Sequence, residues 1–253
     1  ALDSLALPAC PPSHITILQY SKTVRPPEKL NYRLNDEGFR MNKDELHLIE
    51  KTEKRVRERM AGQQSGHGVD HVLRVVRLAR QIQAEAGGDP LIIELAAWLH
   101  DIGDAKFHKG VERSGEFSRE LLNEFGSSQE TREHVVHIVD NISFRKRVDA
   151  KELSLEGKVV QDADRLDALG AIGIVRTIEY GAVVGEPFYL PENHALTSKT
   201  GVQHFHDKLF KLPGLLNTEP ARRMAGQREQ FMRAFIDQFL LECGQHASDS
   251  SEV

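Results

Sequence analysis

The sequence is poor in several features that mark specialised classes of protein. Only two cysteines occur in 253 residues, Cys10 and Cys243, too few for a disulfide framework or a multi-cysteine zinc site. The longest apolar run, 91–99, is broken by Glu94 and falls short of the roughly 18 residues that cross a bilayer. A net charge of −5 disfavours a protein that wraps nucleic acid. We therefore expect a cytoplasmic globular protein without a membrane partner or a stable nucleic-acid complex.

Residues 1–40 differ in composition from the rest of the chain. Five of the ten prolines lie there, and neither a helical nor an alternating apolar period is sustained. We interpret this segment as a flexible extension. Residues 1–27 hold a single acid and several hydroxyl side chains, so organelle targeting stays open beside the cytoplasm. The polar residues 244–253 are expected to form a disordered tail.

The segment 41–243 contains sequence signals typical of helix starts and helix ends. Asn42 and Glu45 form a capping-box pattern, and a second helix ends at Gly87-Gly88. A third helix, Leu91–Asp101, is apolar on most sides and is expected to be central. Strand signals are nearly absent, so one all-α domain, a helical bundle, is predicted. Further helices are expected near 117–125, 135–142, 154–173, 201–212 and 227–243, with a long loop over 181–200.

Histidine and aspartate gather in three stretches, 66–71, 98–104 and 161–167. In the second, His100-Asp101 ends the helix expected to be buried, where a carboxylate beside an imidazole is costly unless its charge is compensated. A divalent cation would compensate it. Adjacent helical residues project about 100° apart, close to the angle between neighbouring ligands of an octahedral ion. A helix end with a surface His-Asp pair is the alternative, and the doublet alone does not decide between them.

The order of these stretches resembles the HD-domain phosphohydrolase superfamily. His71, the His100-Asp101 doublet 29 residues on, and Asp164, 63 residues after Asp101, reproduce its pattern. The resemblance covers roughly Lys43 to Glu242 and implies an HD-domain bundle with one metal held by those four residues. Three stretches are similar to the stand-alone branch that has nucleotide pyrophosphohydrolase activity: His137–Phe144, Asp162–Ala168 and His204–Leu209.

Two imidazoles and two carboxylates suit manganese, iron, cobalt or nickel better than magnesium, which stays an alternative. Zinc is less expected, because its catalytic sites usually have three protein ligands. The expected function is metal-dependent hydrolysis of a phosphoanhydride or phosphoester bond of a nucleotide, or of another phosphorylated small molecule, by a metal-activated water. The competing hypothesis is a sensor module that binds metal and nucleotide without turnover. A homodimer is compatible with either.

Asp104 is the candidate catalytic base. It lies three residues after Asp101, and one helical turn would put both on the same side. It takes the place of the Glu in the His-Asp-x-x-Glu-Asp motif of related alarmone hydrolases, although the second acid of that motif is missing here. The alternative is an ordinary acid in the loop after the helix.

Several basic residues are candidates for phosphate contacts, because cationic side chains clamp phosphoryl groups. Each alone is more often a solvated surface charge, and Lys106, which follows the doublet closely, is favoured. His137 is assigned to the substrate because it lies in a stretch that resembles the family. Asp167 shares a side with Asp164 and is expected to orient a histidine ligand. The expected substrate-binding residues are Lys106, His137, Arg74, Arg145 and Arg165.

Overall fold

The computed structural model describes residues 41–61, 68–105, 108, 110–142, 151–190 and 199–244. Within these ranges every regular element is a helix and none is a strand, which confirms the predicted all-α class. The expected N-terminal extension and the tail after Gly244 lie outside the described residues.

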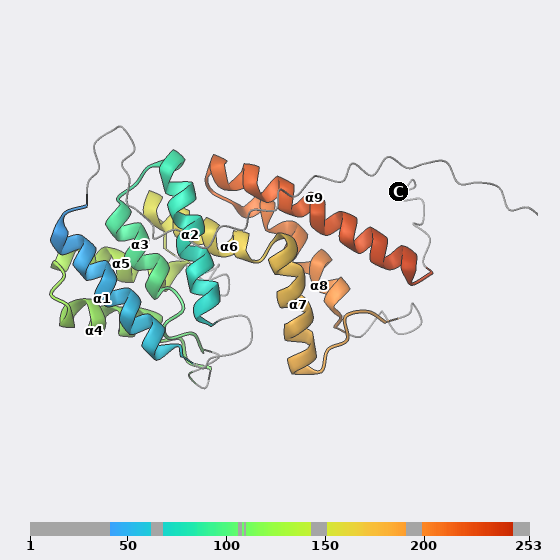
Figure 1. The fold of residues 1–253 in the computed structure, drawn as a ribbon, viewed down its shortest axis with the longest axis horizontal. Coiled ribbons are helices and arrows are strands. Elements are labelled where there is room, and N and C mark those ends of the chain that lie inside the picture. Colours follow the sequence, from blue (N-terminus) through green and yellow to red (C-terminus); the bar gives the residue numbers. More distant parts are fainter. Residues whose placement is uncertain are drawn as a thin grey trace, which may run out of the picture. The chain divides into compact units, whose positions relative to one another are not determined.

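Figure 1 shows the helices in their order along the chain. They are α1 (Lys43–Arg59), α2 (Val69–Ala86), α3 (Pro90–Leu99), α4 (Ser114–Glu124), α5 (Gln129–Asn141), α6 (Leu155–Asp167), α7 (Gly170–Val184), α8 (Gly201–Asp207) and α9 (Glu219–Glu242). Two short 3-10 turns, Leu209–Lys211 and Pro213–Leu215, lie between α8 and α9.

Local hydrogen bonds explain where several helices begin. The Asn42 side chain accepts from the backbone of Glu45, whose carboxylate accepts from the Asn42 backbone at 2.7 Å, so the predicted capping box forms at α1. Asp89 caps α3 through Leu91 N–H at 2.9 Å, and Ser154 caps α6. The caps at Asp89 and Ser154 fix the starts of α3 and α6, two of the helices that position candidate site residues.

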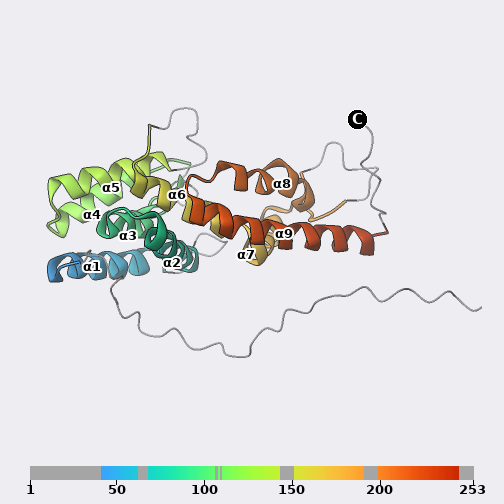
Figure 2. The same cartoon turned by 90° about the horizontal axis from the view of Figure 1, so that it is seen from above.

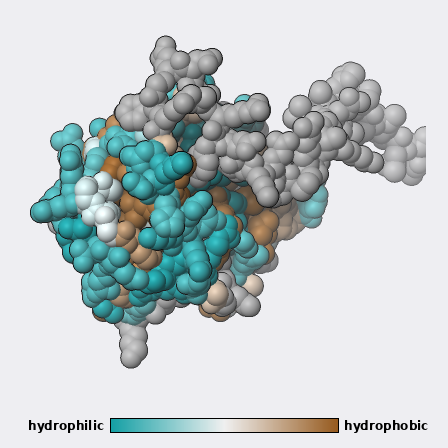
Figure 3. Space-filling view, turned by 60° about the vertical axis from the view of Figure 1, so that its left-hand side comes forward, coloured by the Kyte–Doolittle hydropathy of each residue, from teal (hydrophilic) through white to brown (hydrophobic). Residues whose placement is uncertain are grey.

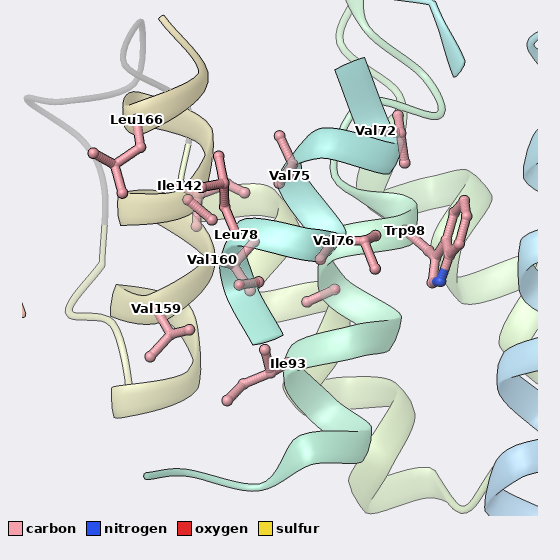
Figure 4. Packing of buried hydrophobic residues seen from close by; sticks show 14 of the residues in the cluster. Val72, Val75, Val76, Leu78, Ile93, Trp98, Ile142, Val159, Val160 and Leu166 are labelled. Carbon is pink, nitrogen blue, oxygen red and sulfur yellow. The ribbon is translucent and has the colours of Figure 1, made fainter. Parts of the chain in front are cut away.

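Helix α3 is the centre of the core, as its apolar sequence predicts. Every residue from Leu91 to Leu99 is buried, and the helix contacts α1, α2, α5 and α6. Figure 4 shows Val76 of α2 next to α3 and Leu78 of α2 next to Val160 of α6, in agreement with the contacts of α2 with both helices. The single acid in the helix, Glu94, is 3% exposed and paired with Arg80. Burial of α3 therefore sets the position of the His100-Asp101 doublet at its end.

Helix α6 joins two groups of helices. It packs along α2, and its other contacts include α7 and α9. Both views show α1–α5 gathered on one side of α6 and α7–α9 on the other (Figures 1 and 2). Asp164 and Asp167, near the end of α6, contact His71 at the start of α2.

The prediction of one helix over 154–173 is wrong. Helix α6 ends at Asp167, and a separate helix, α7, begins at Gly170. Gly170 has φ +75°, in the left-handed region that glycine adopts without strain, so the chain turns there instead of continuing. Helix α7 then runs to Val184, and the first residues of the expected 181–200 loop are helical.

No helix in the described ranges combines the length and the apolar character needed to cross a membrane.

Hydrophilic side chains dominate the face drawn in Figure 3, with hydrophobic patches between them. Among the large hydrophobic side chains that are exposed, several belong to α7, including Val175 and Val183.

Candidate metal centre

His71 lies in the first turn of α2 and is fully buried. Its Nε2 atom is 3.2 Å from His100 Nε2 and 3.4 Å from Asp101 Oδ2. One ligand atom from each of these three residues lies within 4.8 Å of the others. Asp164, from α6, reaches the same imidazole, with its Oδ1 3.4 Å from His71 Nε2. The structure therefore brings together the four residues that were expected to bind the metal.

The turn after α3 is held by the start of α4. Arg113 N–H donates to Gly103 O at 3.0 Å, and Gly103 N–H donates to the Ser114 hydroxyl at 3.1 Å. A Cβ at Gly103 would come within 2.5 Å of the Arg113 backbone, so only glycine fits this close approach. This packing fixes the chain immediately after the doublet.

The ring orientations of both histidines are set by their other nitrogen. His100 Nδ1–H donates to Ala97 O at 2.8 Å, and His71 Nδ1–H donates to Asp167 Oδ2 at 2.7 Å. In neutral imidazoles the two Nε2 atoms then carry lone pairs, and these point at each other. Two lone pairs converging with the carboxylates of Asp101 and Asp164 need a cation between them. The donor set fits a divalent metal ion.

The pKa values of His71 and Asp164 reflect the same excess of hydrogen-bond acceptors around the His71 ring. Burial alone would lower the pKa of His71, but hydrogen bonds to Asp101, Asp164 and Asp167 outweigh it and raise this pKa to about 10. Burial would raise the pKa of Asp164, yet the hydrogen bond from His71 and the attraction of His100 lower it. The site therefore favours positive charge at its centre.

Asp167 supports His71 from behind, as the sequence interpretation expected. Its carboxylate is 1% exposed and also accepts from Arg74 Nε at 2.6 Å and from Arg176 Nη1 at 2.7 Å. Burial would raise the pKa of Asp167, but the hydrogen bonds from His71 and Arg74 and the attraction of Arg176 hold it well below its usual value. A carboxylate behind a histidine ligand fixes its tautomer and orientation.

A cavity of about 550 Å³ opens beside these residues. Its acidic lining consists mainly of Asp101, Asp104, Glu112 and Asp164, next to His100. Its basic lining comes from α6, α7 and the α8 region: Arg165, Arg176, Lys199, His204 and Lys208. Burial, with repulsion from Lys208, lowers the pKa of His204. A cavity whose lining combines a cluster able to bind a metal with cationic side chains suits a phosphorylated ligand.

Some of the predicted catalytic and substrate-binding residues line the cavity, and others do not. Asp104 lines the cavity, and its N–H donates to Asp101 O at 3.2 Å, a tighter turn than the α-helical one expected. Arg165 lines the cavity and also donates to Leu215 O. Arg74 is not among the lining residues. Neither is His137, whose Nε2 is 2.9 Å from Glu152 O. Lys106 and Arg145 lie outside the described residues.

Sequence reasoning assigned no role to the basic residues from α7 onward. His204 and Lys208 lie in the stretch His204–Leu209, which resembles the family. That resemblance was the signal that could have identified them. Arg176 belongs to no motif, but it is one of only two charged residues in α7, whose other residues are mostly apolar. An isolated charge in such a helix could have been read as a residue that faces a site.

Comparison with known proteins agrees with this geometry. The family model named HD domain matches residues 68–169. The uncharacterized protein YpgQ of Bacillus subtilis is 39% identical over 196 residues, covering 77% of this chain and 93% of YpgQ. The crystal structure of YpgQ in complex with ADP matches with TM-score 0.66 and 34% identity, covering 77% of this chain and 97% of that one.

A crystal structure of an HD-superfamily hydrolase from Bacillus thuringiensis matches with TM-score 0.65 and 37% identity. The match covers 80% of this chain and 100% of that one. Together with the His100-Asp101 doublet at the end of α3, these similarities show that the chain belongs to the HD-domain superfamily of hydrolases.

Proposed function

We propose that this protein is a divalent-metal-dependent phosphohydrolase that cleaves a phosphoanhydride or phosphoester bond of a nucleotide. One observation carries the proposal. The Nε2 atoms of His71 and His100 face each other at 3.2 Å among carboxylates, at the edge of a cavity with a basic lining.

His71, His100, Asp101 and Asp164 would hold the ion. Their mixed nitrogen and oxygen donors favour manganese, iron, cobalt or nickel over magnesium. The bound ion would supply Lewis acidity, which acidifies water and offsets charge on a phosphoryl oxygen. Asp167 would keep the His71 ring in the orientation that presents Nε2 to the ion.

Asp104 is the proposed proton acceptor. It lines the cavity a short turn after Asp101, outside the group of ligand atoms around His71. Water would attack phosphorus and lose a proton to the Asp104 carboxylate, while the bond from phosphorus to the leaving oxygen breaks. Its position suits a water held between the acidic cluster and the substrate.

The basic lining would bind the phosphate groups of the substrate. Arg165 and Arg176 present guanidinium groups, which match phosphate oxygens in shape and charge, and Lys199 adds an ammonium. The ADP complex of the similar YpgQ supports a nucleotide as ligand. The substrate roles of His137, Lys106 and Arg145 remain predictions. Arg74, which is not in the cavity lining and donates to Asp167, would hold that carboxylate instead of the substrate role predicted for it. So do the limits of the catalytic domain at residues 41 and 243.

The test is a release screen for phosphate and pyrophosphate over a set of nucleoside mono-, di- and triphosphates, with Mn²⁺ and with EDTA. We expect Mn²⁺-dependent release that Asp101→Asn abolishes. Isothermal titration with Mn²⁺ on the same samples separates binding from turnover. A wild-type chain that binds Mn²⁺ and nucleotide without release would be a sensor module, and one that binds no metal would contradict the proposal.

A further inference from the structure

The buried carboxylate of Asp167 is shared by three side chains. It accepts from His71 Nδ1 at 2.7 Å, from Arg74 Nε and Nη2 at 2.6 and 3.0 Å, and from Arg176 Nη1 at 2.7 Å. One guanidinium is enough to balance its charge. The second arginine therefore brings a positive charge that Asp167 does not require, and this charge needs another explanation.

The two arginines differ in what else they face. Arg74, on α2, binds Asp167 through both Nε and Nη2 and is absent from the cavity lining. Arg176, on α7, binds Asp167 with Nη1 alone and lines the cavity. Within the described part of the chain, the Nε–H and Nη2–H groups of Arg176 have no hydrogen-bond acceptor. A guanidinium has five N–H donors, so Arg176 retains donors for a ligand.

Gly173 allows the Arg176 side chain to contact Asp167 and to line the cavity at the same time. A Cβ at Gly173 would lie only 2.2 Å from Ala168 O, so α7 approaches the end of α6 more closely than any other residue would permit. Arg176 follows three residues later and is 17% exposed at its side chain. The close approach thus places one guanidinium between Asp167 and the cavity.

We propose that Arg176 is a positioning residue that couples phosphate binding to the metal centre. Its Nη1 holds Asp167, and through it the ring of His71. Its remaining donors bind an oxygen of the substrate's phosphate in the cavity. Substrate binding and the orientation of the metal ligand His71 then both depend on the side chain of Arg176. This inference rests on the proposed function, because it assumes a metal at His71 and a phosphorylated ligand in the cavity.

The structure offers a matched set of variants for the test. Of the two features that the proposal links, Arg74 has the contact with Asp167, Lys199 has the place in the cavity lining, and Arg176 has both. Metal affinity is measured by isothermal titration with Mn²⁺ in anion-poor buffer. Lysine keeps the charge but lacks the fork, so Arg176→Lys and Arg74→Lys should each weaken Mn²⁺ binding about tenfold, the lower end for residues that orient a ligand. Lys199→Gln should leave it unchanged.

The second measurement uses sulfate, a tetrahedral dianion, with the EDTA-treated, metal-free full-length chain. Binding is read from the rise in melting temperature with sulfate, against sodium chloride at equal ionic strength. Glutamine is used here because lysine could still bind the anion. Arg176→Gln should weaken sulfate binding about tenfold, as loss of a charge-assisted hydrogen bond does. Lys199→Gln should also weaken it, and Arg74→Gln should not.

The inference stands if substitutions of Arg176 change both affinities while those of Arg74 and Lys199 change one each. It is overturned if Arg176 affects only one, or if Arg74→Gln weakens sulfate as much as Arg176→Gln. Far-UV circular dichroism checks folding. If a lysine variant does not fold, the glutamine variant replaces it in the Mn²⁺ titration; if Arg176→Gln does not fold, Arg176→Met, which also removes the charge, replaces it in the sulfate measurement. A wild-type chain that binds no Mn²⁺ would overturn the proposed function as well, which distinguishes the two failures.

Discussion

Replacement of Asp104 by asparagine tests the proposed chemistry directly. Asparagine has nearly the size and shape of aspartate and keeps one oxygen acceptor, so the turn between Asp101 and Gly103 should persist, as should its packing on the start of α4. It does not act as a proton acceptor at neutral pH. We therefore expect the fold and Mn²⁺ affinity to remain while turnover falls.

The expected loss of turnover in Asp104→Asn follows from the proposed role of Asp104 as general base. Loss of a general base costs typically 10²–10⁴-fold in rate, or about 2.7 to 5.4 kcal/mol of transition-state stabilisation. Asp104 lines the cavity, and in the proposed scheme it takes a proton without binding the ion. The loss should therefore appear in kcat, with little change in the metal titration.

The assay is steady-state kinetics with the best nucleotide from the release screen, together with metal analysis of the same sample. Asp101→Asn is the matched control, since it changes a proposed ligand three residues earlier and should remove metal and activity together. Near-normal turnover in Asp104→Asn would refute its role as base. Loss of bound Mn²⁺ would instead put Asp104 among the ligands, and the proposed coordination would have to be redrawn.

Three further outcomes follow from the structure. Asp167→Asn should weaken Mn²⁺ binding about 10- to 100-fold and lower the melting temperature, because His71 loses its orienting carboxylate and two arginines lose a buried partner; titration calorimetry and thermal denaturation measure both effects. Leu95→Ala, at a fully buried position in α3, should cost about 2 to 5 kcal/mol of unfolding free energy in urea denaturation, and a smaller loss would contradict the central place of α3. Deletion of residues 1–40 should leave folding and Mn²⁺ binding intact, since the capping box at Asn42 starts the helical part; an aggregating product would show that the domain boundary is misplaced.

Much of the fold could be predicted because its signals are local. The capping box at Asn42 and the glycine pair after α2 mark helix ends by backbone chemistry that acts within a few residues. The central place of α3 followed from nine residues that are apolar except for Glu94. The residues of the candidate metal centre were recognised from their order along the chain, and the structure brings His100, Asp101 and Asp164 to the imidazole of His71.

The break between α6 and α7 could not be predicted in the same way. The residues around it, 166–175, favour a helix on both sides, and only glycines interrupt the apolar pattern. A glycine inside a helical pattern indicates either a close packing contact or a turn, and the sequence alone does not say which. Here both occur, since Gly170 turns the chain at φ +75° and Gly173 packs on Ala168.

That break decides which residues face the cavity. If one helix continued from Leu155 past Gly173, Arg176 would extend along the axis of α6, away from Asp167. The turn instead starts α7 in a new direction beside the end of α6, so that Arg176 reaches a carboxylate nine residues earlier in the chain. The same turn lets Arg176 and Thr177 of α7 line the cavity together with Lys199 and Lys208. The motif residues form the candidate metal centre, whereas the part of the cavity lining that α7 contributes depends on the turn at Gly170 and the close packing at Gly173, which motif order does not encode.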